Sequence, residues 1–145
     1  ELEKLSGEEE RCYQYFISRK KSSSHISYVC LTLADMDYLY ENYDQDLVIT
    51  VSRYTANVLA EESGFLGLVS YYDNPEKSDL IQFRLRRSQG YTNLDLREVL
   101  GRFEIENGGG HPGAVGFRIE KKQIDDIGAY TEKLISVIES MVQNP

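Results

Sequence analysis

Residues 108–117 read Gly-Gly-Gly-His-Pro-Gly-Ala-Val-Gly-Phe. Three consecutive glycines contribute no side chains to a core, and glycine loses more backbone freedom on folding than any other residue. Such a run is typical of a backbone that adopts unusual φ/ψ values or approaches a ligand closely, and its N–H groups can converge on an anion. His111 could donate a hydrogen bond or a positive charge to the same anion. We therefore predict a glycine-rich turn that binds phosphate, followed by a short buried strand over 114–119; the alternative is a plain tight loop with an exposed histidine.

The rest of the chain alternates between helix-like and strand-like patterns. Apolar spacing of three and four residues favours helices, and runs rich in β-branched and aromatic residues favour strands. The expected helices are 7–19, a short one beginning at Asp35 as N-cap, 54–62, 94–102 with Asn93 as cap, and 124–142. The expected strands are 26–33, 65–73, 80–87 and 116–120, and residues 46–52 have strand composition without a clear assignment. This order predicts an α/β fold: one domain with a mixed sheet of about five strands and helices packed on it.

Composition limits the class of protein. The 145 residues are enough for one domain with a core, and 41% hydrophobic residues argue against disorder. No apolar run is long enough to cross a bilayer and no signal peptide is visible, so we expect a cytoplasmic protein with no membrane partner. The two cysteines, Cys12 and Cys30, are then expected as reduced thiols.

The charge distribution favours a small anionic ligand. The formal net charge is −8, which does not suit a broad nucleic-acid-binding surface. Six arginines nevertheless fall within 35 residues and could form a local basic pocket: Arg84, Arg86, Arg87, Arg97, Arg102 and Arg118. On the alternating segment 80–87, Arg84 and Arg86 share one face. They could instead be solvated residues on an open sheet face.

The string Gly108–Phe117 resembles the signature of the DHHA1 domain, the C-terminal substrate-binding domain of DHH-family phosphoesterases. That family includes RecJ-like exonucleases, oligoribonucleases, cyclic-dinucleotide phosphodiesterases and exopolyphosphatase-related proteins. The resemblance extends to Ile81–Ser88, which is similar to the strand carrying the family's substrate-binding arginine, and to the connecting helix at 93–100. It is strong over about 80–140 and weaker over about 25–80.

The resemblance implies a division of labour between two domains. In the family, an upstream domain with an Asp-His-His triplet holds two divalent ions, usually manganese, that activate the attacking water. This chain has no such triplet, and its two histidines are His25 and His111. We therefore expect no metal site, cofactor or catalytic residue here, and manganese in an absent DHH domain joined in cis. Residues 1–24 would be a helix and linker from that domain, and 25–145 the DHHA1-like domain; the absence of Met before Glu1 fits this expectation.

Carried over to this sequence, the resemblance predicts a set of substrate-binding residues. Gly108, Gly109 and Gly110 would form a backbone cradle for a phosphate, and His111 would hydrogen-bond the phosphate or ribose. Arg86 is the expected phosphate-binding arginine and Arg84 the second choice. Arg87 stays open, because the family has Ser directly after its arginine and here Arg87 precedes Ser88.

Other candidate residues have simpler explanations. Asp35 and Asp37 look like half a metal site but are expected to cap a helix. The aromatic pairs Tyr71–Tyr72 and Tyr13–Phe16 could stack on bases but are expected to pack, and His25 is expected at the surface.

Two classes of function follow. The first is the substrate-binding half of a phosphodiesterase acting on short oligonucleotides, dinucleotides or other phosphate-containing ligands, with an inactive isolated chain and an active parent hydrolase. The second is a stand-alone nucleotide- or RNA-binding module without activity. A homodimer is compatible with both.

Overall fold

In the computed structural model, which describes residues 4–143, one mixed six-stranded sheet is combined with five α-helices. The strands are β1 (Lys20–Ser22), β2 (Ile26–Cys30), β3 (Leu66–Tyr72), β4 (Leu80–Arg87), β5 (Gly108–His111) and β6 (Ala114–Glu120). The helices are α1 (Gly7–Ile17), α2 (Leu33–Asn42), α3 (Gln45–Ser63), α4 (Arg97–Arg102) and α5 (Ile127–Gln143), with a 3₁₀ turn at Lys121–Gln123. The predicted α/β class and single domain are confirmed.

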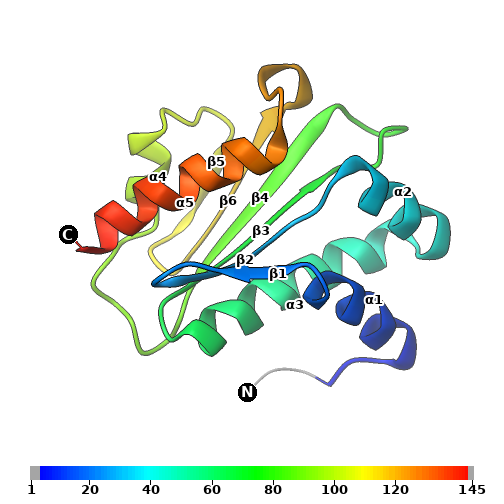
Figure 1. Cartoon of the computed structure of the whole chain (residues 1–145), viewed down its shortest axis with the longest axis horizontal. Helices are drawn as coiled ribbons and strands as arrows, with labels where there is room; N and C mark the ends of the chain where they lie inside the picture. The colour runs from blue at the N-terminus through cyan, green and yellow to red at the C-terminus, as the bar shows by residue number, and fades with distance from the viewer. Residues whose placement is uncertain (1–3, 144–145) are drawn as a thin grey trace.

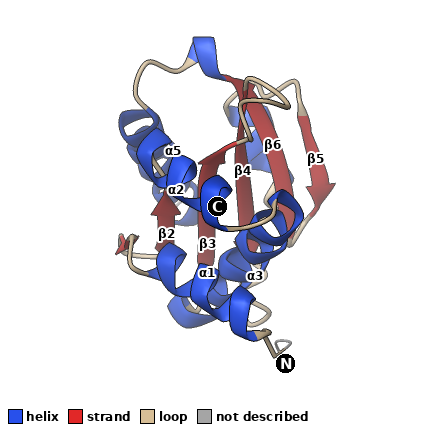
Figure 2. Ribbon diagram, turned by 90° about the vertical axis from the view of Figure 1, so that its right-hand side faces the viewer, coloured by secondary structure: helices blue, strands red, loops and turns tan. Residues whose placement is uncertain are grey.

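The sheet has the order β1-β2-β3-β4-β6-β5. β2 and β3 are parallel and connected by the helices α2 and α3, whereas all other neighbours are antiparallel. β5 lies at the edge of the sheet beyond β6 (Figure 2). The prediction of about five strands did not include the short edge strands β1 and β5.

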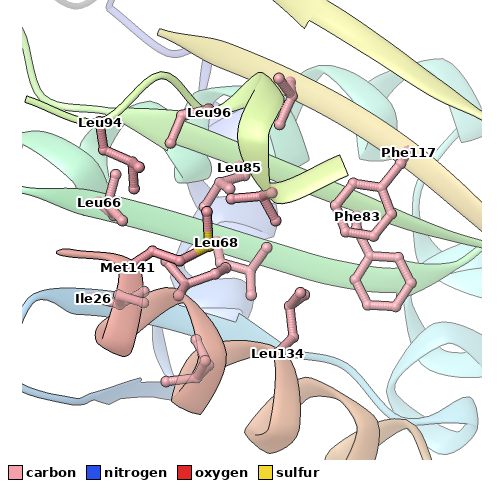
Figure 3. Packing of buried hydrophobic residues seen from close by; sticks show 14 of the residues in the cluster. Ile26, Leu66, Leu68, Phe83, Leu85, Leu94, Leu96, Phe117, Leu134 and Met141 are labelled. Atoms are coloured by element: carbon pink, nitrogen blue, oxygen red, sulfur yellow. The ribbon is translucent and has the colours of Figure 1, made fainter. Parts of the chain in front are cut away.

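Helices cover both faces of the sheet (Figure 1). On one face, α4 and α5 pack against apolar side chains of β3, β4 and β6, among them Leu68, Phe83 and Phe117. Figure 3 shows side chains of α5 and of the segment before α4 meeting these strands. On the other face, a second cluster joins α1, α2 and α3 to β2 and β3, with Phe16 and Tyr71 fully buried.

The largest difference from the sequence prediction is α3, a single helix of 19 residues. Residues 46–52, which have strand composition, form its first two turns. The buried positions Val48, Val51, Thr55 and Leu59 follow helical spacing and face the sheet, so the packing of one apolar stripe outweighs the β propensity of the individual residues. The helix ends at Gly64, whose φ of 77° completes a left-handed C-cap as the Ser63-Gly64 pair predicts.

Smaller differences concern element ends. α2 begins at Leu33, with Thr32 as N-cap, and Asp35 is the third helical residue of a capping box rather than the N-cap. The strand expected over 26–33 therefore ends at Cys30. α4 and α5 each begin three residues after the expected start, and Asn93 does not cap α4.

No helix among residues 4–143 combines the length and the hydropathy needed to cross a membrane. Both cysteines are free thiols, as expected.

Candidate anion-binding cleft

A cleft of about 600 Å³ lies between α3, the end of β4 and the β5–β6 turn. Its lining residues come from segments far apart in the sequence: Asn57, Glu61, Arg86, Arg87, Gln89, His111, Gly113 and Ala114. Two of the six predicted site residues, Arg86 and His111, therefore meet at one place, together with Arg87.

Gly67 on β3 determines how close α3 comes to this part of the sheet. A Cβ atom at Gly67 would lie 2.4 Å from the backbone nitrogen of Ala60 and 2.5 Å from the carbonyl oxygen of Ala56. Only a glycine permits such close contact between helix and strand. Gly67 pairs with Arg86 on β4, so the same close contact places one side of α3 next to the Arg86 side chain.

Arg86 is a half-buried guanidinium without an acidic partner. Its Nη1 donates to the carbonyl oxygens of Leu85 (3.0 Å) and Val115 (3.1 Å), and Nε and Nη2 make no hydrogen bond to residues 4–143. Burial, followed by the positive charges of Arg84 and Arg53, lowers the pKa of Arg86 below its usual value. An anion in the cleft would relieve this repulsion and use the free donors.

The strand register aligns Arg86 with His111. Arg86 pairs with Ala114 on β6, which pairs with His111 on β5, so the three side chains share one face. With strands about 5 Å apart, Arg86 and His111 are about 10 Å apart at their Cα atoms. The small side chain of Ala114 lies between them, and a phosphate has room above it.

The β5–β6 turn is held in place by its neighbours. The carbonyl oxygens of Pro112 and Gly113 accept hydrogen bonds from the backbone N–H groups of Leu96 (2.9 Å) and Arg87 (3.0 Å). The exposed His111 ring accepts at Nδ1 from the Gly113 N–H at 3.4 Å. Its Nε2 makes no hydrogen bond to residues 4–143 and is available to a ligand.

The predicted glycine-rich turn is an edge strand. Gly108, Gly109 and Gly110 are extended and pair with Phe117, Gly116 and Val115 of β6. Successive N–H groups of a strand point in opposite directions, so the expected convergent cradle is absent from these three residues. The turn itself lies two residues later, at Pro112 and Gly113.

The three glycines differ in what they do for the fold. A Cβ at Gly108 would lie 2.6 Å from that of Phe117, and one at Gly110 would lie 2.1 Å from the Ala114 carbonyl oxygen. Gly110 also has a φ of 149°, which L residues rarely adopt. A Cβ at Gly109 would have no atom within 4 Å. Within the described chain, neither packing nor dihedral angle requires glycine at position 109, and an external group can come close to its backbone.

Arg84 lies two residues before Arg86 on the same face of β4, and most of its guanidinium nitrogens donate within the protein. Its Nε donates to Ser52 Oγ (3.1 Å), and its Nη2 donates to the hydroxyl of the buried Tyr71 (2.8 Å). Arg87 Nη1 donates to the Leu94 carbonyl oxygen at 2.8 Å. Arg86 and Arg87 therefore each keep Nε and Nη2 free of hydrogen bonds to residues 4–143, and both line the cleft.

Sequence reasoning missed one side of the cleft. Arg53, Asn57 and Glu61 lie four residues apart on α3 and so share one helix face. Asn57 and Glu61 already share a face of the expected helix 54–62, and Arg53 falls just outside it, but nothing in the sequence places that face beside β4. Arg53, Arg84 and Arg86 form no ion pair with a carboxylate within residues 4–143.

The structure also shows where the other candidate residues from the sequence lie. Tyr71 and Phe16 are buried packing residues, as expected. His25 lies at the surface but is only partly exposed: its Nδ1 lies 2.7 Å from Glu139 Oε1 and its ring packs edge-on against Phe65. No group of three or more His, Cys, Asp or Glu side chains among residues 4–143 could hold a metal ion.

Comparison with known proteins supports the fold. No protein-family model and no curated protein sequence matches the chain. Among solved structures, the chain is similar to a pGpG-specific phosphodiesterase, PggH from Vibrio cholerae, with a TM-score of 0.58 and 16% sequence identity. The match covers 92% of this chain and 39% of the phosphodiesterase, so the chain spans less than half the length of that protein. At this identity the similarity shows a shared fold, that of one part of a dinucleotide phosphodiesterase.

Proposed function

We propose that this chain is the DHHA1-like, substrate-binding part of a phosphodiesterase that acts on short oligonucleotides or dinucleotides. Residues 25–145 form the main part of the substrate-binding domain, and residues 1–24 connect it to an upstream catalytic domain, with α1 and β1 packed on and paired with its sheet. That domain supplies the manganese ions and the hydrolytic step, and this chain supplies the contacts to a phosphate.

The observation that carries the proposal is the unpaired guanidinium of Arg86. A half-buried cation without a carboxylate is unfavourable unless a ligand neutralises it, and here Arg53 and Arg84 add to the local positive charge. The planar guanidinium can contact two phosphate oxygens at once.

Two neighbouring features support the same ligand. His111 faces the cleft from the far side of Ala114 and can donate through Nε2 when Nδ1 accepts from Gly113. The accessible backbone at Gly109 lies on the same sheet face, since Gly109 pairs with Gly116 and Gly116 pairs with Arg84. The similarity in fold to a pGpG-specific phosphodiesterase agrees with a dinucleotide as ligand.

The proposal is tested by titrating the ¹⁵N-labelled chain with pApA at low salt and without metal, following amide chemical shifts that detect millimolar binding. We expect shifts at residues 86–89 and 109–114. Arg86→Ala should weaken binding about tenfold or more, because a hydrogen-bonded charge pair contributes about 1.5–3 kcal/mol. His111→Ala should weaken it while the rest of the spectrum stays unchanged.

The matched control is Arg102→Ala. Arg102 is an exposed arginine on α4, which packs on the opposite face of the sheet, and its loss changes the net charge by the same amount. Binding that survives in Arg86→Ala, or falls equally in Arg102→Ala, would contradict the proposal. So would the absence of any shift at the cleft up to millimolar pApA.

A further inference from the structure

Glu61 is an acidic side chain in a cleft that otherwise favours anions. Its two carboxylate oxygens are held separately: Oε1 accepts from the hydroxyl of the buried Ser88 at 3.0 Å, and Oε2 accepts from the Gln89 N–H at 2.9 Å. The carboxylate is thus fixed in orientation by the segment that follows β4. It nevertheless lines the cleft and is exposed to solvent.

The fixed carboxylate retains unused acceptor sites. An ionised carboxylate offers about four lone-pair sites, two on each oxygen, and Ser88 and Gln89 use one on each. Glu61 forms no ion pair with Lys, Arg or His in the part of the chain that the structure describes. One acceptor site on each oxygen therefore remains available to a ligand with two neighbouring donors.

The negative charge of Glu61 makes this end of the cleft less favourable for a phosphate than the Arg86–His111 end. The phosphate therefore lies at the Arg86–His111 end, and a different part of the nucleotide lies beside Glu61. Among the RNA bases, guanine alone presents two neighbouring donor groups, N1–H and N2–H, on its Watson–Crick edge, with the O6 acceptor next to them. Adenine, cytosine and uracil each present one donor group on that edge.

A second cleft residue complements the same edge. Asn57 precedes Glu61 by four residues on α3, so the two side chains are neighbours on the helix surface. The Asn57 amide makes no hydrogen bond within residues 4–143, and its NH₂ group can donate to O6.

We propose that the α3 end of the cleft binds a guanine base, with Glu61 accepting from N1–H and N2–H and Asn57 donating to O6. This inference rests on the proposed function, because the Arg86–His111 end must hold the phosphate of the same nucleotide. Ser88 and Gln89 act as positioning residues for the carboxylate.

The first test compares three 5′-phosphorylated dinucleotides with the unmodified chain: pGpG, pApA and the inosine analogue pIpI. Hypoxanthine keeps N1–H and O6 but lacks the N2 amine. We expect pGpG to bind about tenfold tighter than pIpI, the ratio typical of one hydrogen bond to a charged group, and tighter than pApA by at least as much. Equal affinity for pGpG and pIpI would overturn the inference.

The second test compares Glu61→Gln with Glu62→Gln. The two changes remove the same charge from adjacent positions of α3, but Glu62 pairs with Lys20 and does not line the cleft. We expect Glu61→Gln to weaken pGpG binding about tenfold or more and to leave pApA binding within twofold, with no effect from Glu62→Gln. An equal loss for both dinucleotides would show that Glu61 only positions the 88–89 segment, and would overturn the base contact.

These outcomes separate the two proposals. If all three dinucleotides bind equally and lose affinity in Arg86→Ala, the phosphate site stands and the guanine site is wrong. If binding is independent of Arg86, the proposed function itself is wrong.

Discussion

At the scale of single residues, the three consecutive glycines of β5 have different roles. Gly108 and Gly110 are required by packing, and Gly110 also by its dihedral angle, whereas Gly109 faces open space on the sheet face that carries Arg84 and Arg86. A glycine that the fold does not need is a strong indication of an external group that approaches its backbone.

This difference predicts opposite behaviour for two variants. Gly109→Val should leave the free energy of unfolding within about 0.5 kcal/mol of the original, because the side chain points into solvent and valine suits a strand. It should abolish dinucleotide binding by covering the backbone. Gly110→Ala should destabilise the chain by about 1–3 kcal/mol, since its Cβ would collide with the Ala114 carbonyl group in a strained conformation.

Urea denaturation and a pApA titration of both variants give the answer. Full binding by a stable Gly109→Val chain would exclude the backbone of β5 from the ligand site.

The sequence identified single residues well where their chemistry is unusual. Residue type and strand alternation single out His111 and the pair Arg84 and Arg86, the DHHA1 resemblance favours Arg86 of that pair, and the structure brings Arg86 and His111 to one cleft. Glu61 and Asn57 carried no such signal, because a surface glutamate and a surface asparagine on a helix are ordinary. Glu61 and Asn57 become candidate binding residues only because the close contact at Gly67 brings α3 beside β4.

At the scale of elements, α1 and α2 are joined through one carboxylate. Asp35 Oδ1 accepts from the Tyr15 hydroxyl (2.8 Å) and from Arg19 Nε (3.0 Å), and Oδ2 accepts from the Thr32 N–H (2.9 Å). Burial alone would raise the pKa of Asp35, but the hydrogen bonds from Thr32, Tyr15 and Arg19 outweigh it, and the net shift is downward.

The lowered pKa predicts a pH dependence of stability. A carboxyl group with a pKa lower in the folded than in the unfolded state stabilises the fold fully above pH of about 4, and this contribution is lost as the pH falls through the folded-state pKa. Asp35→Asn should therefore reduce the free energy of unfolding by about 1–3 kcal/mol at pH 7, and the difference from the unmodified chain should shrink towards pH 3.

Urea unfolding of both proteins at several pH values measures this difference. A gap of constant size from pH 7 to pH 3 would show that the charge of Asp35 does not stabilise the α1–α2 contact.

Strands could be predicted from the sequence where burial of one face makes apolar and polar residues alternate. β4 has the predicted bounds, because Ile81, Phe83 and Leu85 alternate with polar residues on a half-buried strand. The edge strands β1 and β5 are exposed along their whole length and have no hydrophobic alternation that could reveal them. Their strand conformation comes from pairing with β2 and β6, which is a property of the folded sheet.

At the scale of the whole molecule, negative charge predominates, but the region around the cleft is positively charged. The formal net charge is −8, yet within the described chain Arg53 and Arg84 lie close enough to Arg86 to lower its pKa, and Arg86 lines the cleft. A single small basic site in an acidic protein suits a short anionic ligand and repels a long one.

This arrangement predicts that affinity does not grow with ligand length. A 20-nucleotide RNA should bind no more than about twofold tighter than a dinucleotide, because phosphates beyond the cleft meet negative charge. Fluorescence anisotropy with 5′-phosphorylated RNAs of two to twenty nucleotides at constant ionic strength measures this relation. A steady rise in affinity with length would indicate an extended RNA-binding surface, and thus favour the stand-alone RNA-binding module.

The close contact at Gly67 has a consequence for how such a site can change over time. The distance between α3 and the sheet is set at Gly67 on β3, where backbone atoms meet a residue without a side chain, so substitutions on the outer face of α3 do not alter it. Positions 57 and 61 can therefore exchange one hydrogen-bonding group for another while the width of the cleft is maintained. The width of the cleft and its ligand preference depend on different residues, and a descendant of this chain could acquire a new base specificity through two substitutions without changing the spacing between α3 and the sheet.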